Sequence, residues 1–304
     1  MFLMDLLQKM KHAVRGEIRA REPLAGHTTW KIGGPADFYV SPLDLEDLRS
    51  TLEFSRQEGL RCFVIGRGSN LLVSDDGFRG IVIDLAGAFN RISSSGSTVT
   101  AGSGVLLSDL VDFCIRKRMK GLEKLSGIPG QVGGAIRMNA GAFGVEAGDR
   151  LQSVRLMDFS GTLLQIHREQ ILMKYRFTDL PADAAILEAD FRMDKGDAEE
   201  MAETREEILK KRSEKQPLSL PSAGSVFKRP SGDYAGRLIE EAGLKGLRIG
   251  DAMISKKHAN FIVNCGFATA VDVLRLVEEI QKRVRSHFHV DLEFEIQLLG
   301  FGHP

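Results

Sequence analysis

The chain of 304 residues is long enough for two domains, or for one large domain with an appendage. Its hydrophobic content of 43% and charged content of 27% are typical of a soluble globular protein, and its formal net charge of +0 gives no general attraction to nucleic acid or to an anionic membrane. No apolar run reaches the length of a membrane span, and no basic region precedes the apolar N-terminus. We therefore expect a cytoplasmic protein without a signal peptide.

The cysteine pattern argues against disulfides and metal sites. The three cysteines, at positions 62, 114 and 265, are odd in number and show no CxxC spacing. This usage predicts buried thiols in a reducing compartment. No set of Cys and His residues has metal-ligand spacing, so we expect no metal.

The hydrophobic pattern predicts an α+β class. Apolar residues at helical spacing predict a helix at the N-terminus, and the first two thirds of the chain otherwise contain mainly short strands. We predict strands at 37–40, 62–65, 72–74, 81–85, 98–101, 154–157, 163–167, 185–192, 259–264 and 290–299. We predict further helices at 44–58, 106–118, 198–214, 233–242 and 271–287. In the last strand, alternation places Leu292 and Ile296 on one face and Glu295 on the other.

Two glycine-rich stretches indicate ligand-binding loops. Gly66-Arg-Gly-Ser-Asn-Leu71 follows a strand, but position 71 is Leu and no clear helix follows, so the Rossmann fingerprint is not met. The stretch also lacks the Gly-Lys-Ser/Thr ending of a P-loop. Its amides can still form a nest for a pyrophosphate, or the stretch can be a plain turn. The second stretch, Gly127–Gly144, is the most glycine-dense in the chain, and two such loops in one domain favour a large phosphate-bearing ligand.

A third stretch, Ser219–Asp233, combines a turn with basic residues. Gly224 permits a tight turn that presents the Ser225 hydroxyl, and Lys228 and Arg229 follow at once. From 208 to 258 there are eleven Lys and Arg against five Asp and Glu. This excess predicts a cleft for an anionic substrate, unless it is ordinary surface patchiness.

Taken singly, the other polar residues are ambiguous. Arg176 in Tyr-Arg-Phe-Thr and Glu295 on the last strand both match ordinary surface residues as well as catalytic ones. His258 is more consistent with a packing or capping role than with catalysis. No Gly-x-Ser-x-Gly elbow is present, so hydrolysis gains no support.

In combination, the motifs resemble those of the UDP-N-acetylenolpyruvoylglucosamine reductases. The matching pieces occur in the family's order over roughly residues 27 to 300. They are His27-Thr-Thr-Trp-Lys-Ile-Gly-Gly-Pro-Ala-Asp37, Gly66-Arg-Gly-Ser-Asn-Leu-Leu72, Gly127-Ile-Pro-Gly-Gln-Val-Gly-Gly-Ala-Ile-Arg-Met-Asn-Ala-Gly-Ala142, Tyr175-Arg176, Pro221-Ser-Ala-Gly-Ser-Val-Phe-Lys-Arg-Pro230, Ala242-Gly-Leu-Lys-Gly246, His258-Ala-Asn-Phe-Ile-Val-Asn264 and Leu292-Glu-Phe-Glu-Ile296.

The resemblance implies a fold and a reaction. It implies an N-terminal helix and lead-in over 1–26, an FAD-binding domain of the p-cresol methylhydroxylase type over 27–196, and a smaller α+β substrate-binding domain over 197–304. It further implies FAD as cofactor, NADPH and UDP-N-acetylenolpyruvoylglucosamine as partners, and UDP-N-acetylmuramate, a peptidoglycan precursor, as product. We expect a monomer.

The resemblance also assigns residues to roles. It implies Arg176 as the cation that stabilises the growing enolate, Glu295 as its partner, and Ser225 as the proton donor. It implies cofactor contacts for Trp30, Gly66, Arg67, Gly68, Ser69, Asn70, Leu71, Gly102, Ile128, Pro129, Gly130, Gly133, Gly134, Ala135 and Asn139. It implies substrate contacts for Tyr175, Lys215, Lys228 and Arg229.

Three features distinguish this chain within the family pattern. Arg229 stands where many members have Asn, and Thr178 stands where Ser is frequent. Only 48 residues separate Arg176 from Ser225. This spacing is too short for the loop that one subclass folds over its substrate, so we expect the subclass without that loop.

Two other classes of protein remain open from the sequence. One is a flavin oxidase or dehydrogenase that uses the same FAD-binding scaffold with another substrate. The other is a catalytically silent nucleotide- or flavin-binding scaffold.

Overall fold

The computed structural model describes residues 2–302, which form two compact units. Unit 1 comprises Met1–Arg21, Asp37–Gly66 and Arg79–Lys210, and unit 2 comprises Glu22–Ala36, Arg67–Phe78 and Lys211–Pro304. These units are defined by spatial contacts, and two segments from the first third of the chain belong to unit 2. The division along the chain at residues 26 and 196 stays a prediction.

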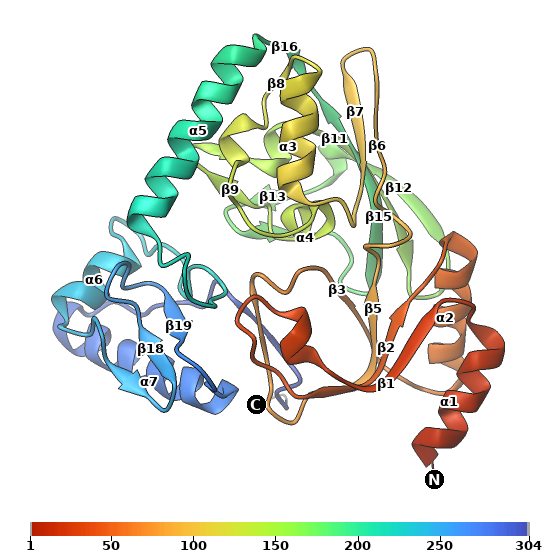
Figure 1. The fold of residues 1–304 in the computed structure, drawn as a ribbon, viewed down its shortest axis with the longest axis horizontal. Coiled ribbons are helices and arrows are strands. Elements are labelled where there is room, and N and C mark those ends of the chain that lie inside the picture. Colours follow the sequence, from red (N-terminus) through yellow and green to blue (C-terminus); the bar gives the residue numbers. More distant parts are fainter. Residues whose placement is uncertain (1, 303–304) are drawn as a thin grey trace. The chain divides into compact units, whose positions relative to one another are not determined.

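The helices are α1 (Phe2–Ala13), α2 (Leu45–Gln57), α3 (Leu107–Arg116), α4 (Val132–Arg137), α5 (Ala198–Lys215), α6 (Ala235–Glu241) and α7 (Ala270–Phe288) (Figure 1). All the predicted helices are present, and α4 is an additional one. Side chains cap several of them; at the start of α5 the Asp197 carboxylate accepts from the amides of Glu199 and Glu200. The Asp44 carboxylate accepts from the Asp47 amide at the start of α2, and the Thr269 hydroxyl and the Asp272 carboxylate form a capping box at the start of α7.

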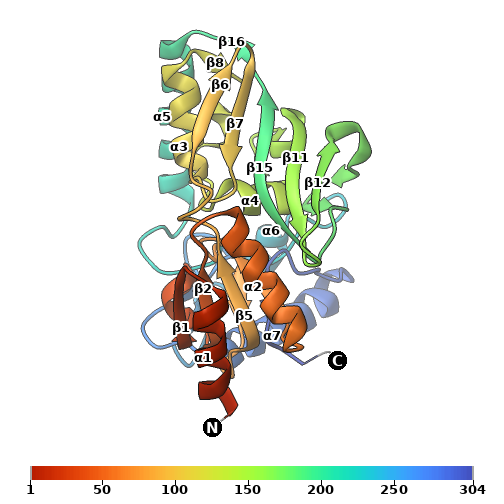
Figure 2. The ribbon, with the colours of Figure 1, turned by 90° about the vertical axis from the view of Figure 1, so that its right-hand side faces the viewer.

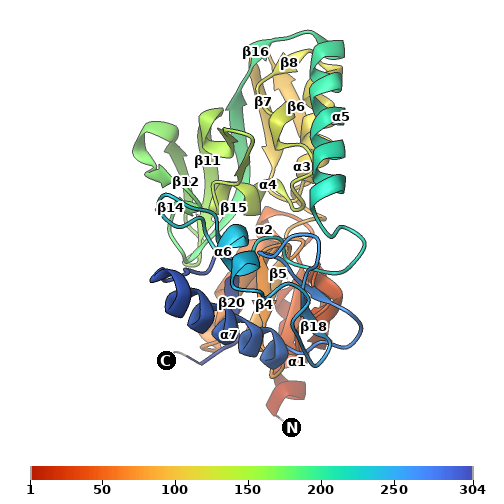
Figure 3. The same cartoon turned by 90° about the vertical axis from the view of Figure 1, so that its left-hand side faces the viewer.

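Unit 1 contains a five-stranded antiparallel sheet in the order β12-β11-β15-β7-β6. Its strands are β6 (Ile92–Ser95), β7 (Thr98–Gly102), β11 (Leu151–Asp158), β12 (Leu163–His167) and β15 (Ala184–Arg192). Figures 2 and 3 show α3 and α5 on the same side of this sheet. Between sheet and helices lies an apolar core that includes Val99, Leu110 and Ile136, so one face of the sheet is buried.

A second sheet, most of which belongs to unit 1, has the strand order β1-β2-β5-β3. Its strands are β1 (Glu17–Pro23), β2 (Pro35–Ser41), β3 (Cys62–Ile65) and β5 (Phe78–Asp84), with β3 and β5 parallel. Helices α1 and α2 contact each other beside it (Figure 2). Met10 of α1 and Leu52 of α2 are fully buried in one cluster with Phe38 of β2, so the amphipathic helices cover this sheet.

Short strand pairs complete unit 1. They are β8 (Met119–Lys120) with β16 (Asp194–Lys195), β9 (Gly141–Ala142) with β10 (Val145–Glu146), and β13 (Met173–Lys174) with β14 (Phe177–Thr178). The last two pairs lie in the loops that carry the predicted residues Asn139 and Arg176.

Unit 2 contains a three-stranded antiparallel sheet of β17 (Arg248–Ile249), β18 (Ala252–Ile254) and β19 (Ile262–Asn264). Helix α7 packs against β17 and β18, and α6 contacts α7 (Figure 3). A parallel pair joins β4 (Leu71–Val73) to β20 (Gln297–Leu299). The Asp75 carboxylate, just after β4, accepts from the amides of Ala270 and Val271 and so ties this pair to the start of α7.

The final strand is shorter than predicted, because regular pairing begins only at Gln297. The residues before it make a single isolated bridge, between Phe227 and Phe294. The segment around Phe227, which lies opposite these residues, forms no regular strand. A continuous ladder of β-sheet hydrogen bonds therefore does not form. The predicted faces hold in part: Leu292 and Ile296 are buried and Glu293 is exposed, whereas Phe294 and Glu295 are both half-buried. Similarly, the predicted strand at 259–264 is regular only over β19, because Phe261 turns back to hydrogen-bond the His258 carbonyl.

The sequence patterns missed several short strands, among them β6, β17 and β18, and two longer elements, β1 and α4. β1 carries charged residues at alternate positions and is an edge strand with little burial, so its hydrophobic signal is weak. α4 lies in the glycine-dense stretch that we had taken as a loop, and Gly133 and Gly134 lower its intrinsic helix propensity. Burial of Val132, Ala135 and Ile136 stabilises α4 nevertheless.

The prediction of buried thiols holds fully only for Cys114. Cys62 and Cys265 are half-buried, and all three cysteines are free. Burial, with a smaller contribution from Glu123, raises the pKa of Cys114 to about 12. Across residues 2–302, no helix is long and apolar enough to cross a membrane. The same residues contain no group of three or more His, Cys, Asp or Glu side chains that could hold a metal ion.

Candidate active site

The sequence-predicted site residues fall into two groups, one in each unit. Unit 1 contains Gly66, Gly102, Ile128, Pro129, Gly130, Gly133, Gly134, Ala135, Asn139, Tyr175 and Arg176. Unit 2 contains Trp30, Arg67, Gly68, Ser69, Asn70, Leu71, Lys215, Ser225, Lys228, Arg229 and Glu295.

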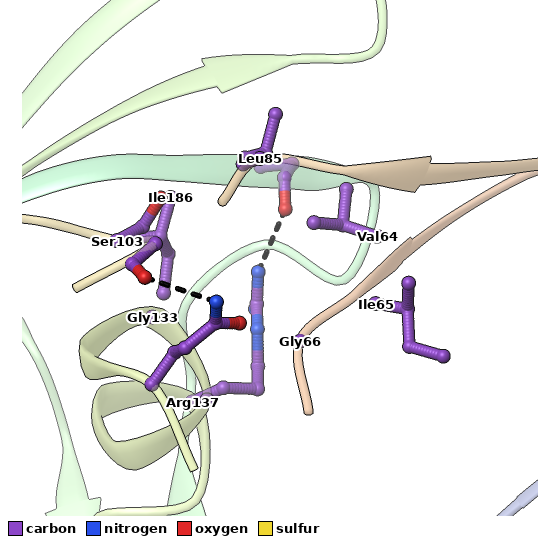
Figure 4. A pocket seen from close by; sticks show the side chains of 12 residues that line it. Val64, Ile65, Gly66, Leu85, Ser103, Gly133, Arg137 and Ile186 are labelled. Carbon is purple, nitrogen blue, oxygen red and sulfur yellow. Dashed lines mark hydrogen bonds between the residues drawn. The ribbon is translucent and has the colours of Figure 1, made fainter. Parts of the chain in front are cut away.

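In unit 1, three of the predicted cofactor residues line one cavity. Gly66 follows β3, and Gly133 and Gly134 lie in the first turn of α4, around a cavity of about 110 Å³ (Figure 4). Apolar side chains of Val64, Leu85 and Ile186 form much of its wall.

Close backbone approach explains why glycine stands at position 66. A Cβ placed there would lie 2.8 Å from Oε1 of Gln131, a side chain that is itself held by donation to the Gly104 carbonyl at 2.9 Å. Any larger residue would therefore displace Gln131, which also lines the cavity.

Two polar residues of this cavity were not singled out from the sequence. The Ser103 hydroxyl is buried and has no hydrogen-bond partner among the described residues. The Arg137 guanidinium donates to the carbonyls of Leu180, Pro181 and Ala184 at 2.8–2.9 Å, and none of the described carboxylates pairs with it. Burial lowers the pKa of Arg137.

Among the described residues, the buried Ser103 hydroxyl has no hydrogen-bond partner and the half-buried Arg137 guanidinium has no carboxylate partner, and both conditions are costly away from water. A polar, anionic ligand in the cavity would satisfy both groups. The sequence carried a weak signal for them, because Ser103 lies between Gly102 and Gly104 and Arg137 lies within the glycine-dense stretch.

The other predicted cofactor residues of unit 1 lie next to this wall in the chain. Gly102 precedes Ser103, and Ile128–Gly130 lead into α4, where the Gly130 carbonyl accepts from the Leu107 amide at 3.0 Å. Ala135 is buried in α4. Asn139 follows α4 but is enclosed, with 1% of its surface exposed.

Arg176 lies in the loop between β13 and β14. Its backbone is left-handed, with φ of 56°, an uncommon conformation for a residue with a side chain. The guanidinium carbon lies 4.9 Å from the ring centroid of Tyr175, and Nη2 donates to the Gly141 carbonyl at 3.1 Å. Two independent contacts therefore restrict the orientation of this cation.

In unit 2, the glycine loop 67–71 is tied to the C-terminal segment. Asn70 Nδ2 donates to the Glu295 carbonyl at 3.0 Å, and the Asn70 carbonyl accepts from the Gln297 amide at 2.9 Å. Trp30 is wholly buried: its indole N–H donates to the Ile262 carbonyl at 2.9 Å. Its ring is therefore part of the core, and only its backbone remains for the predicted cofactor contact.

The segment that carries Ser225 lies beside the segment that carries Glu295. The Glu295 amide donates to the Val226 carbonyl at 2.8 Å, and the Lys228 amide donates to the Glu293 carbonyl at 2.9 Å. The buried side chain of Asn260 also holds the Ser225 segment. Its Oδ1 accepts from the Phe227 N–H at 3.0 Å, and its Nδ2 donates to the Phe227 carbonyl at 2.8 Å. The structure thus places side by side the backbone segments of two predicted catalytic residues, and Ser225 is half-buried.

The predicted substrate-binding residues of unit 2 lie nearby in the chain or at its surface. Lys228 Nζ lies 3.3 Å from Glu293 Oε2, so this cation is paired with a carboxylate. The Arg229 guanidinium carbon lies 4.5 Å from the Tyr234 ring centroid. Lys215, the last residue of α5, is exposed.

His258 has a structural role, as the sequence favoured. Its Nδ1 accepts from the Asn260 amide at 3.3 Å, and its ring lies 4.8 Å from that of Phe261. Burial, with a smaller contribution from Lys245, lowers the pKa of His258, which favours the neutral ring needed to accept that bond.

Comparison with known proteins gives matches to both parts of the chain. Residues 36–167 match the model of an FAD binding domain, and residues 216–299 match the model described as UDP-N-acetylenolpyruvoylglucosamine reductase, C-terminal domain. The expected fold class, an FAD-binding domain followed by a smaller α+β domain, is thereby confirmed.

Relatives match over nearly the whole chain. The UDP-N-acetylenolpyruvoylglucosamine reductase of Alkaliphilus oremlandii is 45% identical over 280 residues, which is 92% of each chain, and that of Lachnoclostridium phytofermentans is 41% identical over 97% of each. The crystal structure of UDP-N-acetylenolpyruvylglucosamine reductase from Thermus caldophilus superposes with a TM-score of 0.81 at 39% identity, covering 94% of this chain and 99% of that chain. Identity of this extent across both domains establishes that the chain belongs to the UDP-N-acetylenolpyruvoylglucosamine reductase family.

Proposed function

We propose that this protein is an NADPH-dependent flavoenzyme that reduces the enolpyruvyl ether of UDP-N-acetylenolpyruvoylglucosamine to UDP-N-acetylmuramate for peptidoglycan synthesis. The observation that carries the proposal is identity of 45% over 92% of both chains with a reductase of that name. The match of one chain to both an FAD binding domain and a reductase C-terminal domain supports it independently.

The unit 1 cavity supports FAD as the cofactor. Among the described residues the Ser103 hydroxyl has no hydrogen-bond partner and the Arg137 guanidinium no carboxylate partner, and these groups suit the hydroxyl and phosphate groups of a dinucleotide. Bound FAD would supply the hydride chemistry that connects NADPH to the terminal carbon of the substrate. The chain itself supplies binding, charge and the proton.

Arg176 is the proposed electrophilic cation. As the hydride arrives, negative charge develops beside the substrate carboxylate, and a preoriented guanidinium stabilises such an enolate. Glu295 is the proposed partner that orients or polarises it. Ser225 donates the proton to the enolate carbon, and Lys228 favours the alkoxide that remains. Tyr175, Lys215 and Arg229 are proposed to contact the substrate.

Replacement of Arg137 by glutamine should weaken FAD binding by roughly 10- to 100-fold, because a charge-assisted contact is lost from an enclosed site. Titration of the apoprotein with FAD, followed by flavin fluorescence at low and high salt, measures this change. The exposed Arg116→Gln variant in α3 is the matched control and should bind as the native protein does. An unchanged dissociation constant in a folded Arg137→Gln protein would remove Arg137 from the cofactor site.

A two-stage anaerobic titration tests the function itself. We expect a yellow protein whose flavin absorbance is bleached by NADPH and restored by UDP-N-acetylenolpyruvoylglucosamine, with UDP-N-acetylmuramate as the product. Bleaching without restoration would indicate a flavin dehydrogenase for another substrate. A purified protein that binds no flavin would indicate a scaffold.

We further propose that the enzyme acts in the cytoplasm as a monomer. This part of the proposal rests on the family resemblance, and sedimentation velocity of the purified holoenzyme measures the oligomeric state.

A further inference from the structure

The loops around Arg176 contain an unusual concentration of left-handed backbone. Three non-glycine residues of these loops have positive φ: Asn139 at 41°, Phe143 at 52° and Arg176 at 56°. Such residues persist where the surrounding structure holds them in place, and they gather at functional sites. The contacts that hold these loops therefore bear on how the Arg176 guanidinium is oriented.

The Asn139 side chain joins three segments of these loops. Its Nδ2 donates to Glu146 Oε2 at 2.5 Å and to the Lys174 carbonyl at 3.1 Å, and its Oδ1 accepts from the Gly148 amide at 3.0 Å. Both amide protons and the carbonyl oxygen are therefore used within the protein. Because Asn139 is 1% exposed, these bonds are shielded from water.

Two of these hydrogen-bond partners of Asn139, Lys174 and Glu146, are connected to Arg176. Lys174 is two residues before it in the chain. Glu146 is the cross-strand partner of Gly141 in the β9–β10 pair, and the Gly141 carbonyl accepts from Arg176 Nη2 at 3.1 Å. Asn139 thus holds both the backbone that leads into Arg176 and the strand pair that presents the acceptor for its guanidinium.

The packing leaves little freedom for this arrangement to shift. A Cβ added at Gly148 would lie 2.9 Å from Asn139 Oδ1 and 2.6 Å from Met173 Sδ, and one added at Gly141 would lie 2.8 Å from Glu146 Cγ. The loops are therefore closely packed around Asn139, Gly141 and Gly148, and a change at Asn139 displaces the residues that contact it.

We propose that Asn139 is a positioning residue for Arg176, acting through Glu146 and the Lys174 backbone, and that its side chain does not contact the cofactor. The inference rests on the proposed function, because Arg176 is the enolate-stabilising cation only in that reaction. The proposed role differs from the cofactor contact predicted for Asn139, because positioning of Arg176 requires no contact between the Asn139 side chain and a ligand.

Replacement of Asn139 by aspartate tests the proposal, since the side chain keeps its shape and its acceptor for Gly148. The variant loses both donated bonds and places a carboxylate against Glu146. We expect flavin reoxidation by UDP-N-acetylenolpyruvoylglucosamine to slow by about 10- to 100-fold, with FAD affinity and the rate of flavin reduction by NADPH unchanged within about twofold. Single-mixing stopped-flow of each half-reaction measures these rates separately.

Two further variants distinguish positioning from general damage to the fold. In Asn139→Asp/Glu146→Gln the polarity of the contact is reversed, and we expect partial recovery of the reoxidation rate. Glu146→Ala removes the acceptor at a half-buried position, keeps Asn139, and should slow the same half-reaction alone. Asn90→Asp, an exposed change of the same kind in unit 1, is the control.

The outcomes separate this inference from the proposed function. If native protein reduced by NADPH is not reoxidised by the substrate, the proposed function fails. If native protein is reoxidised but Asn139→Asp reacts at the same rate, or loses FAD affinity and NADPH reduction in equal measure, the positioning role is wrong.

Discussion

Replacement of Ser225 by alanine is expected to slow substrate reduction by about 100- to 10,000-fold, the usual contribution of a positioned general acid. Flavin reduction by NADPH should stay at the native rate, because that half-reaction needs no proton donor on the substrate side. The fold should be unaffected, since Ser225 is half-buried and the bonds that hold its segment involve the neighbouring Val226, Phe227 and Lys228. Anaerobic stopped-flow of the two half-reactions measures the difference.

The control for Ser225 lies in the same loop. Ser231 is exposed, and Ser231→Ala should leave both half-reactions unchanged. Native-rate reoxidation in Ser225→Ala would assign the proton to another donor, whereas equal slowing of both half-reactions would point to damage of the flavin site.

Replacement of Arg176 by lysine should slow flavin reoxidation by about 100- to 1,000-fold although the positive charge is kept. The lysine ammonium lacks the planar pair of N–H donors of a guanidinium. It therefore cannot hydrogen-bond both oxygens of the substrate carboxylate at once as this group becomes an enediolate. It also loses the stacked contact with Tyr175 and the bond from Nη2 to the Gly141 carbonyl. We expect substrate dissociation constants to rise less than the rate constant falls, because the contact strengthens as charge develops.

Arg155→Lys provides the comparison for Arg176. Arg155 lies on an exposed position of β11 and pairs with Glu188 at 3.0 Å, so its replacement should alter neither half-reaction. Rates for Arg176→Lys within threefold of native would show that positive charge alone is sufficient, and the argument for an oriented guanidinium would be wrong.

The variants at Asn139, Arg176 and Ser225 should share one signature, namely normal reduction by NADPH and slow reoxidation by substrate. Arg137→Gln should differ by weakening FAD binding. Comparison of these phenotypes therefore separates residues that hold the cofactor from residues that act on the substrate.

The sequence by itself predicted every helix of the described residues except α4, and half of the strands β1–β20, because hydrophobic periodicity reports which face of an element is buried. It also located the glycine-rich loops and, through the order of its motifs, the family. The sequence patterns missed elements whose hydrophobic periodicity is weak or whose residues have low intrinsic propensity for the structure that they adopt. The charged edge strand β1 and the glycine-containing helix α4 are stabilised by neighbours distant in sequence, and the last strand lacks a regular partner until Gln297.

The surroundings of individual polar side chains were decided only by the tertiary structure. Among the described residues, Ser103 is a hydroxyl without a partner, Arg137 a cation without a carboxylate partner, and Asn139 an amide with every bond made inside the protein. The Trp30 ring is buried in the core, which leaves its backbone for the predicted cofactor contact. A hydrogen bond depends on which groups from distant segments arrive within about 3 Å, and residue type and spacing do not contain that information.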